Sequence, residues 1–195
     1  MITIDGVMQA PGGPEEDTSG GFKYGGWTVP FVDDFIGKIM NEQLGHPFDL
    51  LLGKTTYDIF AAYWPYHNEP GEVIGNGFNK AIKYVVSDKP FSPTWDKTIV
   101  IEGDVVAGIR KLKEEDGPEL QVHGSGNFVQ ILLMHDLLDE LWLKIFPITL
   151  GRGKRLFAEG VIPAAFELTE STVTPRGVII ANYKRAGEVK TGAFD

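Results

Sequence analysis

Two glycine turns carry the residues whose types and spacing best suit phosphate binding. In one, the strand-like run Leu120–His123 leads into Gly124-Ser125-Gly126-Asn127, and a helical pattern follows at once. In the other, further upstream, the apolar run Phe48–Leu52 leads into Gly53-Lys54-Thr55-Thr56 and a second helix. Glycine lets a backbone approach a phosphate closely, and the N–H groups at a helix amino terminus favour negative charge. The two turns together predict a nucleotide site, although each alone also fits a simple capped helix.

This prediction has a spatial condition, because the two turns are far apart in the chain. They must converge on the same ligand, with Thr56 and Ser125 on the same side of the folded protein and with their amides not occupied by the protein's own side chains. The hydroxyls of Thr55 and Thr56 and the ammonium of Lys54 would then add donors to the backbone N–H groups.

A third polar group, Ser87-Asp88-Lys89, closes another strand-like run. Ser87 and Lys89 could receive a 2′-phosphate, which would indicate NADP rather than NAD. Asp88 favours NAD instead, because a carboxylate repels the 2′-phosphate and prefers a free ribose hydroxyl. A plain polar turn is the alternative.

Strand-like and helical patterns alternate along the chain. This alternation predicts an α/β fold with a mostly parallel central sheet, helices on both faces and a C-terminal antiparallel hairpin, all in a single domain covering residues 1–195. Ligands of such sheets bind beyond the carboxyl ends of the strands, where both glycine turns lie. The expected strands are 2–4, 48–52, 83–87, 98–101, 120–123, 139–148, 166–173 and 178–184, the expected helices are 30–44, 55–63, 104–114 and 127–134, and 10–26 and 65–77 are expected to be irregular.

Composition excludes several classes of function. The net charge of −9 over 195 residues argues against a general binder of nucleic acid or anionic membranes. The chain has no cysteine, so it forms no disulfide, and its four histidines lack metal-type spacing. No signal peptide or membrane span is evident, and a cytoplasmic protein is expected.

The order of these motifs resembles the dihydrofolate reductase-like superfamily, which has a three-layer α/β fold. More closely, it is similar to the reductase (C-terminal) domain of the bifunctional deaminase-reductase of riboflavin biosynthesis and to stand-alone bacterial proteins of that kind. The resemblance covers nearly the whole chain and is much less specific for a substrate. It is carried by residues 4–13, 49–57, 83–87, 123–128, 138–141 and 147–151.

The resemblance implies NADPH as cofactor. Gly53, Lys54, Thr55 and Thr56 would lie at its phosphates, and Ser87 and Lys89 near the adenosine 2′-phosphate. Gly124, Ser125, Gly126 and Asn127 would hold the pyrophosphate. Family members often carry arginine where Lys54 stands, and lysine lacks the bidentate fork of arginine. A weaker preference for NADP is therefore expected.

The resemblance also suggests two catalytic candidates, His123 and Asp33. His123 would face the nicotinamide and substrate, where an imidazole can hydrogen-bond a carbonyl or donate a proton; a half-buried histidine bonded to backbone is the alternative. Trp27 and Pro30 resemble a Trp-x-x-Pro motif that opens the substrate helix, but the expected acid two positions later is Val32 here. On a helix over 30–44, Asp33 would border the apolar face and Asp34 would point nearly opposite. Asp33 is thus the better candidate, with a helix-start carboxylate as the alternative.

Asp5 and Gly6 match the Asp-Gly of the family and would shape the nicotinamide pocket, together with Trp27 on the substrate side. The loop through Gly26 would be a lid. Its acidic residues do not suit a phosphorylated substrate, and the basic cluster Arg152, Lys154 and Arg155 fits a solvated turn better than a phosphate site.

The expected function is an NADPH-dependent reductase that transfers hydride to a pyrimidine- or pterin-like molecule, or a related imine or carbonyl. It would be similar to 5-amino-6-(5-phosphoribosylamino)uracil reductase and would need no metal. A homodimer is expected by resemblance. The competing class is a nucleotide-binding sensor or scaffold without catalysis. This alternative stays open because the catalytic acid expected two positions after Pro30 is replaced by Val32.

Overall fold

The computed structural model describes residues 1–157, 159 and 162–194, and the chain divides into two compact units. The central unit is Ile36–Phe128, and the terminal unit combines Met1–Phe35 with Val129–Asp195. Helices α1 (Asp34–Leu44) and α5 (Gly126–Met134) each cross a boundary between the two. The expectation of one domain over 1–195 stays a prediction.

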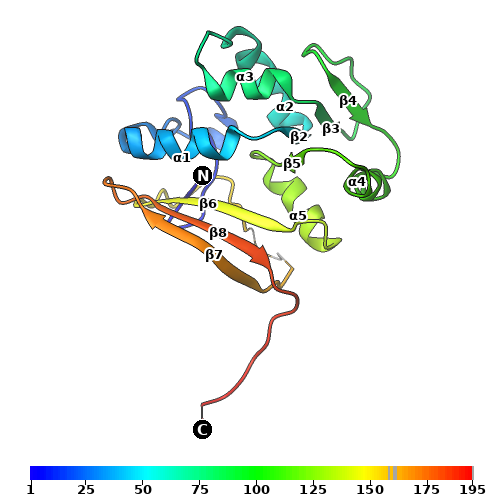
Figure 1. Cartoon of the computed structure of the whole chain (residues 1–195). Coiled ribbons are helices and arrows are strands. Elements are labelled where there is room, and N and C mark those ends of the chain that lie inside the picture. Colours follow the sequence, from blue (N-terminus) through cyan, green and yellow to red (C-terminus); the bar gives the residue numbers. More distant parts are fainter. Residues whose placement is uncertain (158, 160–161, 195) are drawn as a thin grey trace. The chain divides into compact units, whose positions relative to one another are not determined.

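A fully parallel sheet forms the middle of the central unit (Figure 1). Its strands are β2 (Phe48–Gly53), β3 (Lys83–Val86), β4 (Thr98–Ile101) and β5 (Glu119–Gln121), in the order β4-β3-β2-β5. Parallel strands buried on both faces need continuous apolar runs, and Leu50, Leu51 and Leu52 of β2 are all buried. The parallel α/β arrangement predicted from the alternating pattern is thus confirmed.

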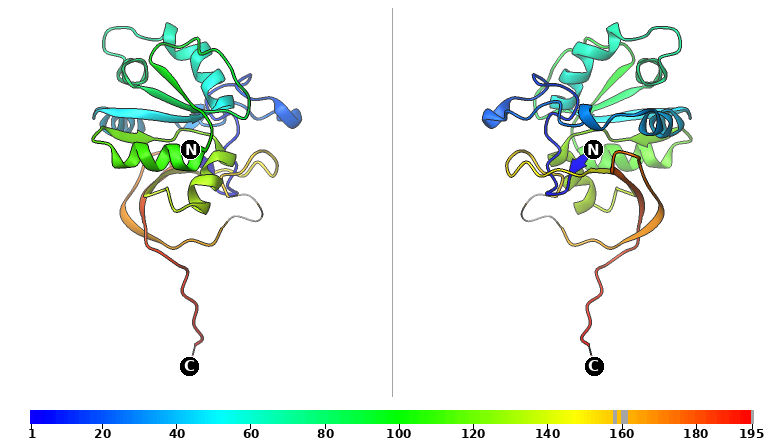
Figure 2. Two further views of the ribbon diagram at one scale, coloured as in Figure 1. Left: turned by 90° about the vertical axis from the view of Figure 1, so that its right-hand side faces the viewer. Right: turned by 90° about the vertical axis from the view of Figure 1, so that its left-hand side faces the viewer.

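The helices of the central unit follow its strands. They are α2 (Lys54–Tyr63), the short η3 (Trp64–Tyr66), α3 (Val73–Lys80) and α4 (Val105–Glu114). Figures 1 and 2 show α2 and α3 on one face of the parallel sheet and α4 on the other. Among the described residues, no helix is both long and apolar enough to cross a membrane.

Helix α3 corrects the prediction that residues 65–77 are irregular. Gly75 and Gly77 look like helix breakers in the sequence, but packing requires them. A Cβ on Gly75 would lie 1.8 Å from the carbonyl oxygen of His67, and one on Gly77 would lie 3.3 Å from the ring of Phe48. The glycines allow the helix to pack closely, which propensity alone does not reveal.

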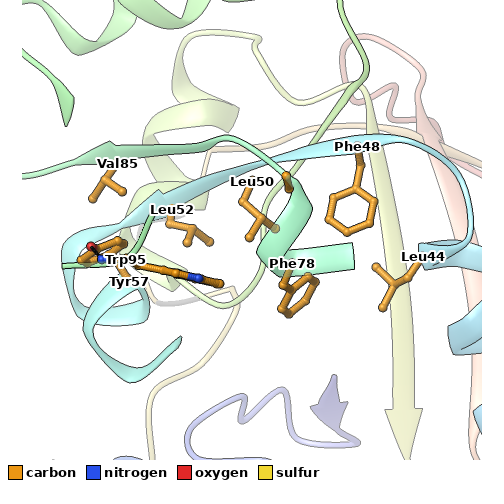
Figure 3. Packing of buried hydrophobic residues seen from close by; sticks show 9 residues of the cluster. Leu44, Phe48, Leu50, Leu52, Tyr57, Phe78, Val85 and Trp95 are labelled. Carbon is orange, nitrogen blue, oxygen red and sulfur yellow. Dashed lines mark hydrogen bonds between the residues drawn. The ribbon is translucent and has the colours of Figure 1, made fainter. Parts of the chain in front are cut away.

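The core of the central unit lies between β2, β3 and the helices that cover them (Figure 3). Leu50, Leu52 and Val85 are completely buried there, and Phe48 meets Phe78 of α3 edge to face at 5.9 Å. Burying a side chain of this size contributes roughly 2 kcal/mol. This core fixes the place where β2 ends and α2 begins.

The N-cap of α4 gives a test of local stability. Asp104 accepts a hydrogen bond from the Ala107 amide at 3.0 Å, as the sequence predicts for the start of this helix. We expect Asp104→Ala to lower the free energy of unfolding by about 1 kcal/mol in urea denaturation, because an N–H of the first turn loses its partner. Asp104→Asn keeps an acceptor and should stay within a few tenths of a kcal/mol of wild type; equal losses in both variants would contradict the capping role.

The terminal unit contains a mixed sheet in the order β1-β6-β8-β7. The strand β1 (Ile2–Thr3) runs parallel to β6 (Glu140–Phe146), while β7 (Phe166–Val173) and β8 (Ile179–Arg185) form the antiparallel hairpin seen in Figure 1. The hairpin is confirmed, although its strands belong to a second sheet rather than to the edge of the first. The short η1 (Ser19–Gly21) and η2 (Val29–Phe31) complete this unit.

Helix α1 starts later than the predicted 30–44. The turn η2 is followed by Val32 in an extended conformation, and α1 begins only at Asp34. Val32 is therefore not part of the helix and is 56% exposed. Of the predicted apolar face, Ile36 is the buried member, at 3% exposure. The helical geometry used to place Asp33 does not apply, because Asp33 lies before the helix.

Candidate nucleotide site

The two glycine turns meet in the central unit. The Ser125 hydroxyl donates to Thr56 Oγ1 at 2.8 Å and accepts from the Gly53 amide at 3.0 Å. These bonds join the end of β2 to the turn after β5, which are adjacent strands in the sheet. Thr56 and Ser125 thus lie on the same side of the central unit, as the prediction requires, whereas the Gly53 amide is occupied by the Ser125 hydroxyl.

Close approach explains the glycine at position 124. Gly124 and Ser125 both have left-handed backbones, with φ of 63° and 58°. A Cβ on Gly124 would lie 3.0 Å from Thr56 Oγ1, so a side chain there would push against α2. Glycine adopts this conformation without steric cost, whereas the left-handed Ser125 is strained, and such strain is typical of ligand-binding turns.

Two helix amino termini lie at this junction. Helix α2 begins at Lys54, and its N-cap Gly53 makes no side-chain capping bond. Helix α5 begins at Gly126, directly after Ser125. Thr55 and Asn127 are exposed, while Thr56 is 8% exposed. Backbone N–H groups and hydroxyls, with glycine where a Cβ would intrude, suit a pyrophosphate, so the residues present fit the dinucleotide that the sequence suggests.

Lys54 is held by its own helix. Its ammonium contacts both carboxylate oxygens of Asp58, at 2.7 and 2.6 Å, and lies 4.6 Å from the centroid of the Phe91 ring. The sequence analysis did not single out Asp58 or Phe91. The spacing of Lys54 and Asp58, four residues apart on a helix, was the signal available for the ion pair.

The turn after β3 is bonded to itself. Ser87 Oγ donates to the carbonyl of Lys89 at 2.7 Å and accepts from its amide at 3.3 Å. Asp88 and Lys89 are exposed. This is the geometry of a polar turn, which was the alternative to a 2′-phosphate site.

His123 is half-buried beside aromatic rings. Its Nε2 lies 3.0 Å from Oε1 of Gln121, and its ring centroid lies 5.0 Å from that of Phe78 and 6.3 Å from that of Phe60. An amide oxygen accepts, so this contact favours the tautomer protonated at Nε2. The catalytic role of His123 stays a prediction.

Asp5 organises a turn of the terminal unit. Its carboxylate accepts from Thr3 Oγ1 at 2.5 Å, from the Gly151 amide at 2.8 Å and from the Leu150 amide at 3.2 Å. The hydrogen bond from Thr3 is the largest cause of a lowered pKa of Asp5, so the carboxylate form is favoured. Gly6 follows with φ of 79°.

The basic cluster is paired within the same unit. Lys154 contacts Asp17 at 2.7 Å, and Arg155 contacts both the carboxylate and the carbonyl of Asp5. Arg152 is exposed. Lys154 and Arg155 thus fasten the turn to the residues that follow β1.

The loop over residues 10–26 is bonded at its base. The buried Gln9 side chain donates to the carbonyls of Asp17 and Ser19, each at 3.0 Å, and accepts from the Lys154 amide. Trp27 closes the loop: it is 6% exposed, and its indole N–H donates to the Gln9 carbonyl at 2.7 Å. The substrate contact predicted for Trp27 stays a prediction.

Asp33 lies between η2 and α1 and is half-buried, whereas Asp34 is exposed. The choice of Asp33 over Asp34 as the catalytic candidate stays a prediction. Asp5, Gly6, Trp27 and Asp33 belong to the terminal unit, and the glycine turns, Ser87, Lys89 and His123 to the central unit.

The chain is similar in sequence to a known family and to two bacterial proteins. The model of the RibD C-terminal domain family matches residues 1–180. The uncharacterized protein YyaP of Bacillus subtilis (strain 168) is 24% identical over 164 residues, covering 81% of this chain and 77% of YyaP. The uncharacterized protein YwjB of the same organism is 24% identical over 138 residues, covering 68% of this chain and 72% of YwjB.

Solved structures are similar in fold. A Shewanella sp. PV-4 protein assigned to riboflavin biosynthesis has a TM-score of 0.64 at 22% identity, covering 95% of each chain. A pyrimidine reductase-like protein from Corynebacterium diphtheriae has a TM-score of 0.59 at 15% identity, covering 96% of this chain and 90% of its own. Dihydrofolate reductase from Enterococcus faecalis, complexed with NADP(H) and RAB-propyl, has a TM-score of 0.58 at 15% identity, covering 94% of this chain and 92% of its own.

Proposed function

Because the chain belongs to the RibD C-terminal domain family, we propose that it is a reductase that uses NADPH and transfers hydride to a pyrimidine- or pterin-like small molecule, or to a related imine or carbonyl. The family and the dihydrofolate reductase-like fold support a reductase-type activity. The use of NADPH and the class of substrate go beyond what the family and the fold support, and they are proposals of their own.

The meeting of the two glycine turns is the observation that carries this proposal. Ser125 bonds to both Gly53 and Thr56, which brings the amino termini of α2 and α5 to one place. One such terminus is common in proteins, whereas two beside a glycine-lined turn suit the paired phosphates of a dinucleotide. Gly53, Thr55, Thr56 and the turn Gly124–Asn127 would hold the pyrophosphate.

The nicotinamide supplies the hydride when NADPH is bound, and the chain supplies binding and orientation. The donors around Ser125 would hold the phosphates and so help to orient the dinucleotide. His123 remains our candidate for hydrogen bonding or proton donation to the substrate, with Asp33 or water as the other proton sources. Asp5, Gly6 and Trp27 are proposed to shape the substrate side.

The substrate that we propose carries no phosphate. Riboflavin-pathway reductases act on a ribose phosphate, which requires cations to bind it. In the terminal unit, Lys154 and Arg155 are engaged by Asp17 and Asp5. This supports a flat heterocycle or imine without the phosphate. We further propose a homodimer, on the basis of the family resemblance, and a location in the cytoplasm, where the sequence features lead us to expect it.

The decisive experiment combines a binding and a turnover measurement on the full chain. NADPH is titrated by fluorescence, and NADPH consumption is followed with a panel of pterins, pyrimidines and cyclic imines. We expect saturable NADPH binding and turnover of at least one compound. Binding without turnover on any compound would favour the sensor, and no binding at all would reject both functions.

His123→Ala tests the proton-donor candidate. We expect kcat on the best substrate to fall by about 100-fold with little change in NADPH affinity, because general acid catalysis contributes on this scale. His46→Ala, an exposed histidine of the same unit, serves as the control and should leave kcat unchanged. Unchanged turnover in His123→Ala would assign this ring to packing against Phe78 and Phe60.

A further inference from the structure

The position of Lys54 separates it from the turn that would hold the pyrophosphate. In the sheet, β2 lies between β3 and β5. Ser125, after β5, contacts Gly53 and Thr56, whereas the Lys54 ammonium lies over Phe91, in the segment that follows β3. The Lys54 ammonium therefore lies beside the segment that follows β3, in which the turn of Ser87, Asp88 and Lys89 precedes Phe91. Its charge is placed for the adenosine end of a dinucleotide.

The charge of Lys54 is opposed at close range. Both oxygens of Asp58 contact the ammonium, at 2.6 and 2.7 Å, and the Phe91 ring restricts where the side chain can move. The side chains of Lys54 and Asp58 are 34% and 58% exposed, so an arriving phosphate would encounter the carboxylate as well as the ammonium. A cation whose partner is a carboxylate attracts a further anion much less than an unpaired one does.

The neighbouring groups on this side add little attraction for a phosphate. The Ser87 hydroxyl is bonded to Lys89 backbone atoms, and the opposite charges of the exposed Asp88 and Lys89 offset each other. NADPH differs from NADH only by the 2′-phosphate. A local balance of charge near zero therefore discriminates weakly between the two.

We propose that Asp58 sets the dinucleotide preference of this protein, because it holds Lys54 in an ion pair and so weakens the attraction for the 2′-phosphate. Asp58 is a specificity-determining residue that acts through Lys54 rather than by touching the cofactor. This inference rests on the proposed dinucleotide site. It predicts that NADH binds with an affinity close to that of NADPH.

Equilibrium titration of the full chain with NADPH and with NADH tests this without any substrate. We expect Asp58→Asn to increase the ratio of the NADH Kd to the NADPH Kd by about fivefold at low salt, since an exposed ion pair of this kind is worth up to about 1 kcal/mol. The increase should shrink at high salt, because exposed charges are screened. The double variant Lys54→Met/Asp58→Asn should return the ratio to the wild-type value.

A matched pair on α4 supplies the control. Lys111 and Glu115 are also four residues apart, with Nζ and Oε1 separated by 3.9 Å. Glu115→Gln changes the net charge by the same amount as Asp58→Asn and should leave the ratio unchanged. Adenosine 2′,5′-bisphosphate compared with AMP serves as a second pair of probes, and the thermal midpoint of each variant checks that it is folded.

The outcomes separate this inference from the proposed function. If both dinucleotides bind and Asp58→Asn leaves the ratio unchanged, or raises both affinities equally, Asp58 does not set the preference and the proposed function still stands. If neither dinucleotide binds to wild type or to any folded variant, the proposed function fails and the role of Asp58 fails with it.

Discussion

Replacing Lys83 with methionine is expected to raise the free energy of unfolding at pH 7 by about 2 kcal/mol, because it removes a charge from the core without leaving a cavity. Lys83 stands in β3 and is completely buried. Its ammonium donates to the Asn79 carbonyl at 3.1 Å and lies 4.3 Å from the centroid of the Trp95 ring. These contacts offset only part of the cost of dehydrating the ammonium.

Burial lowers the pKa of Lys83 from 10.5 to about 8; repulsion from Lys97 lowers this pKa further, and attraction to Asp96 and Asp49 raises it. The folded protein therefore releases this proton near pH 8, while the unfolded chain keeps it until about pH 10.5. Between these values the unfolded state binds more protons, so stability rises with pH. As the pH rises from about 8 to 10.5, deprotonation of Lys83 should increase the free energy of unfolding of the wild-type protein by up to about 3 kcal/mol.

Urea denaturation of wild type and Lys83→Met at intervals from pH 7 to pH 10 measures this effect. The stability advantage of the methionine variant should shrink steadily above pH 8. The difference between the proteins is the useful quantity, because burial also lowers the pKa of Lys144 to about 8 and that effect is common to both. Lys80→Met, at an exposed lysine of the same unit, is the control for the removal of one positive charge. A stability difference for Lys83→Met that does not change with pH would contradict the prediction.

Gly124→Ala is expected to weaken NADPH binding by at least about tenfold, which corresponds to about 1.4 kcal/mol. The added methyl would meet Thr56 Oγ1 at 3.0 Å in a left-handed backbone with φ of 63°. Since Thr56 bonds to Ser125 and Ser125 to Gly53, a shift of Thr56 disturbs both turns. NADPH titration gives the affinity, and urea denaturation gives the accompanying loss of stability.

Gly103→Ala separates backbone strain from crowding. Gly103 has a similar φ of 75°, but nothing lies within 4 Å of its added Cβ. This variant should lose about 1 kcal/mol of stability and keep its NADPH affinity. If both alanine variants bound NADPH as tightly as wild type, the Gly124 turn would not be part of the cofactor site.

Strand β2 was accessible from the sequence because burial on both faces leaves a continuous apolar run, a signal that the mostly exposed β7 does not carry. Strands β4 and β7 occupy the predicted residues, and β2 extends one residue further, to Gly53. Helix α3 was not accessible, since Gly75 and Gly77 lower its propensity and their purpose lies in contacts with His67 and Phe48. The delayed start of α1 depends on the extended backbone of Val32, for which the apolar spacing gives no sign.

The candidate site could be predicted in outline only. The glycine turns follow from local patterns, and their convergence follows from β2 and β5 being adjacent in the sheet. The sequence does not reveal the hydrogen-bond partners of Lys54, Ser87 and Ser125, because several polar groups lie near each of these side chains in a turn. Only coordinates distinguish a hydroxyl that is turned inward, as in Ser125, from one available to a ligand.

The close packing of α3 limits how this protein can be engineered for heat resistance. Exchanging helical glycine for alanine is a standard route to higher melting temperatures, because it restricts the denatured chain. Gly37 in α1 has open space around an added Cβ and is suited to that exchange, whereas Gly75 would drive a methyl into a carbonyl oxygen and Gly108 would press on Ile101. A redesign that replaced all three glycines with alanine would gain stability at Gly37 and lose stability at Gly75 and Gly108.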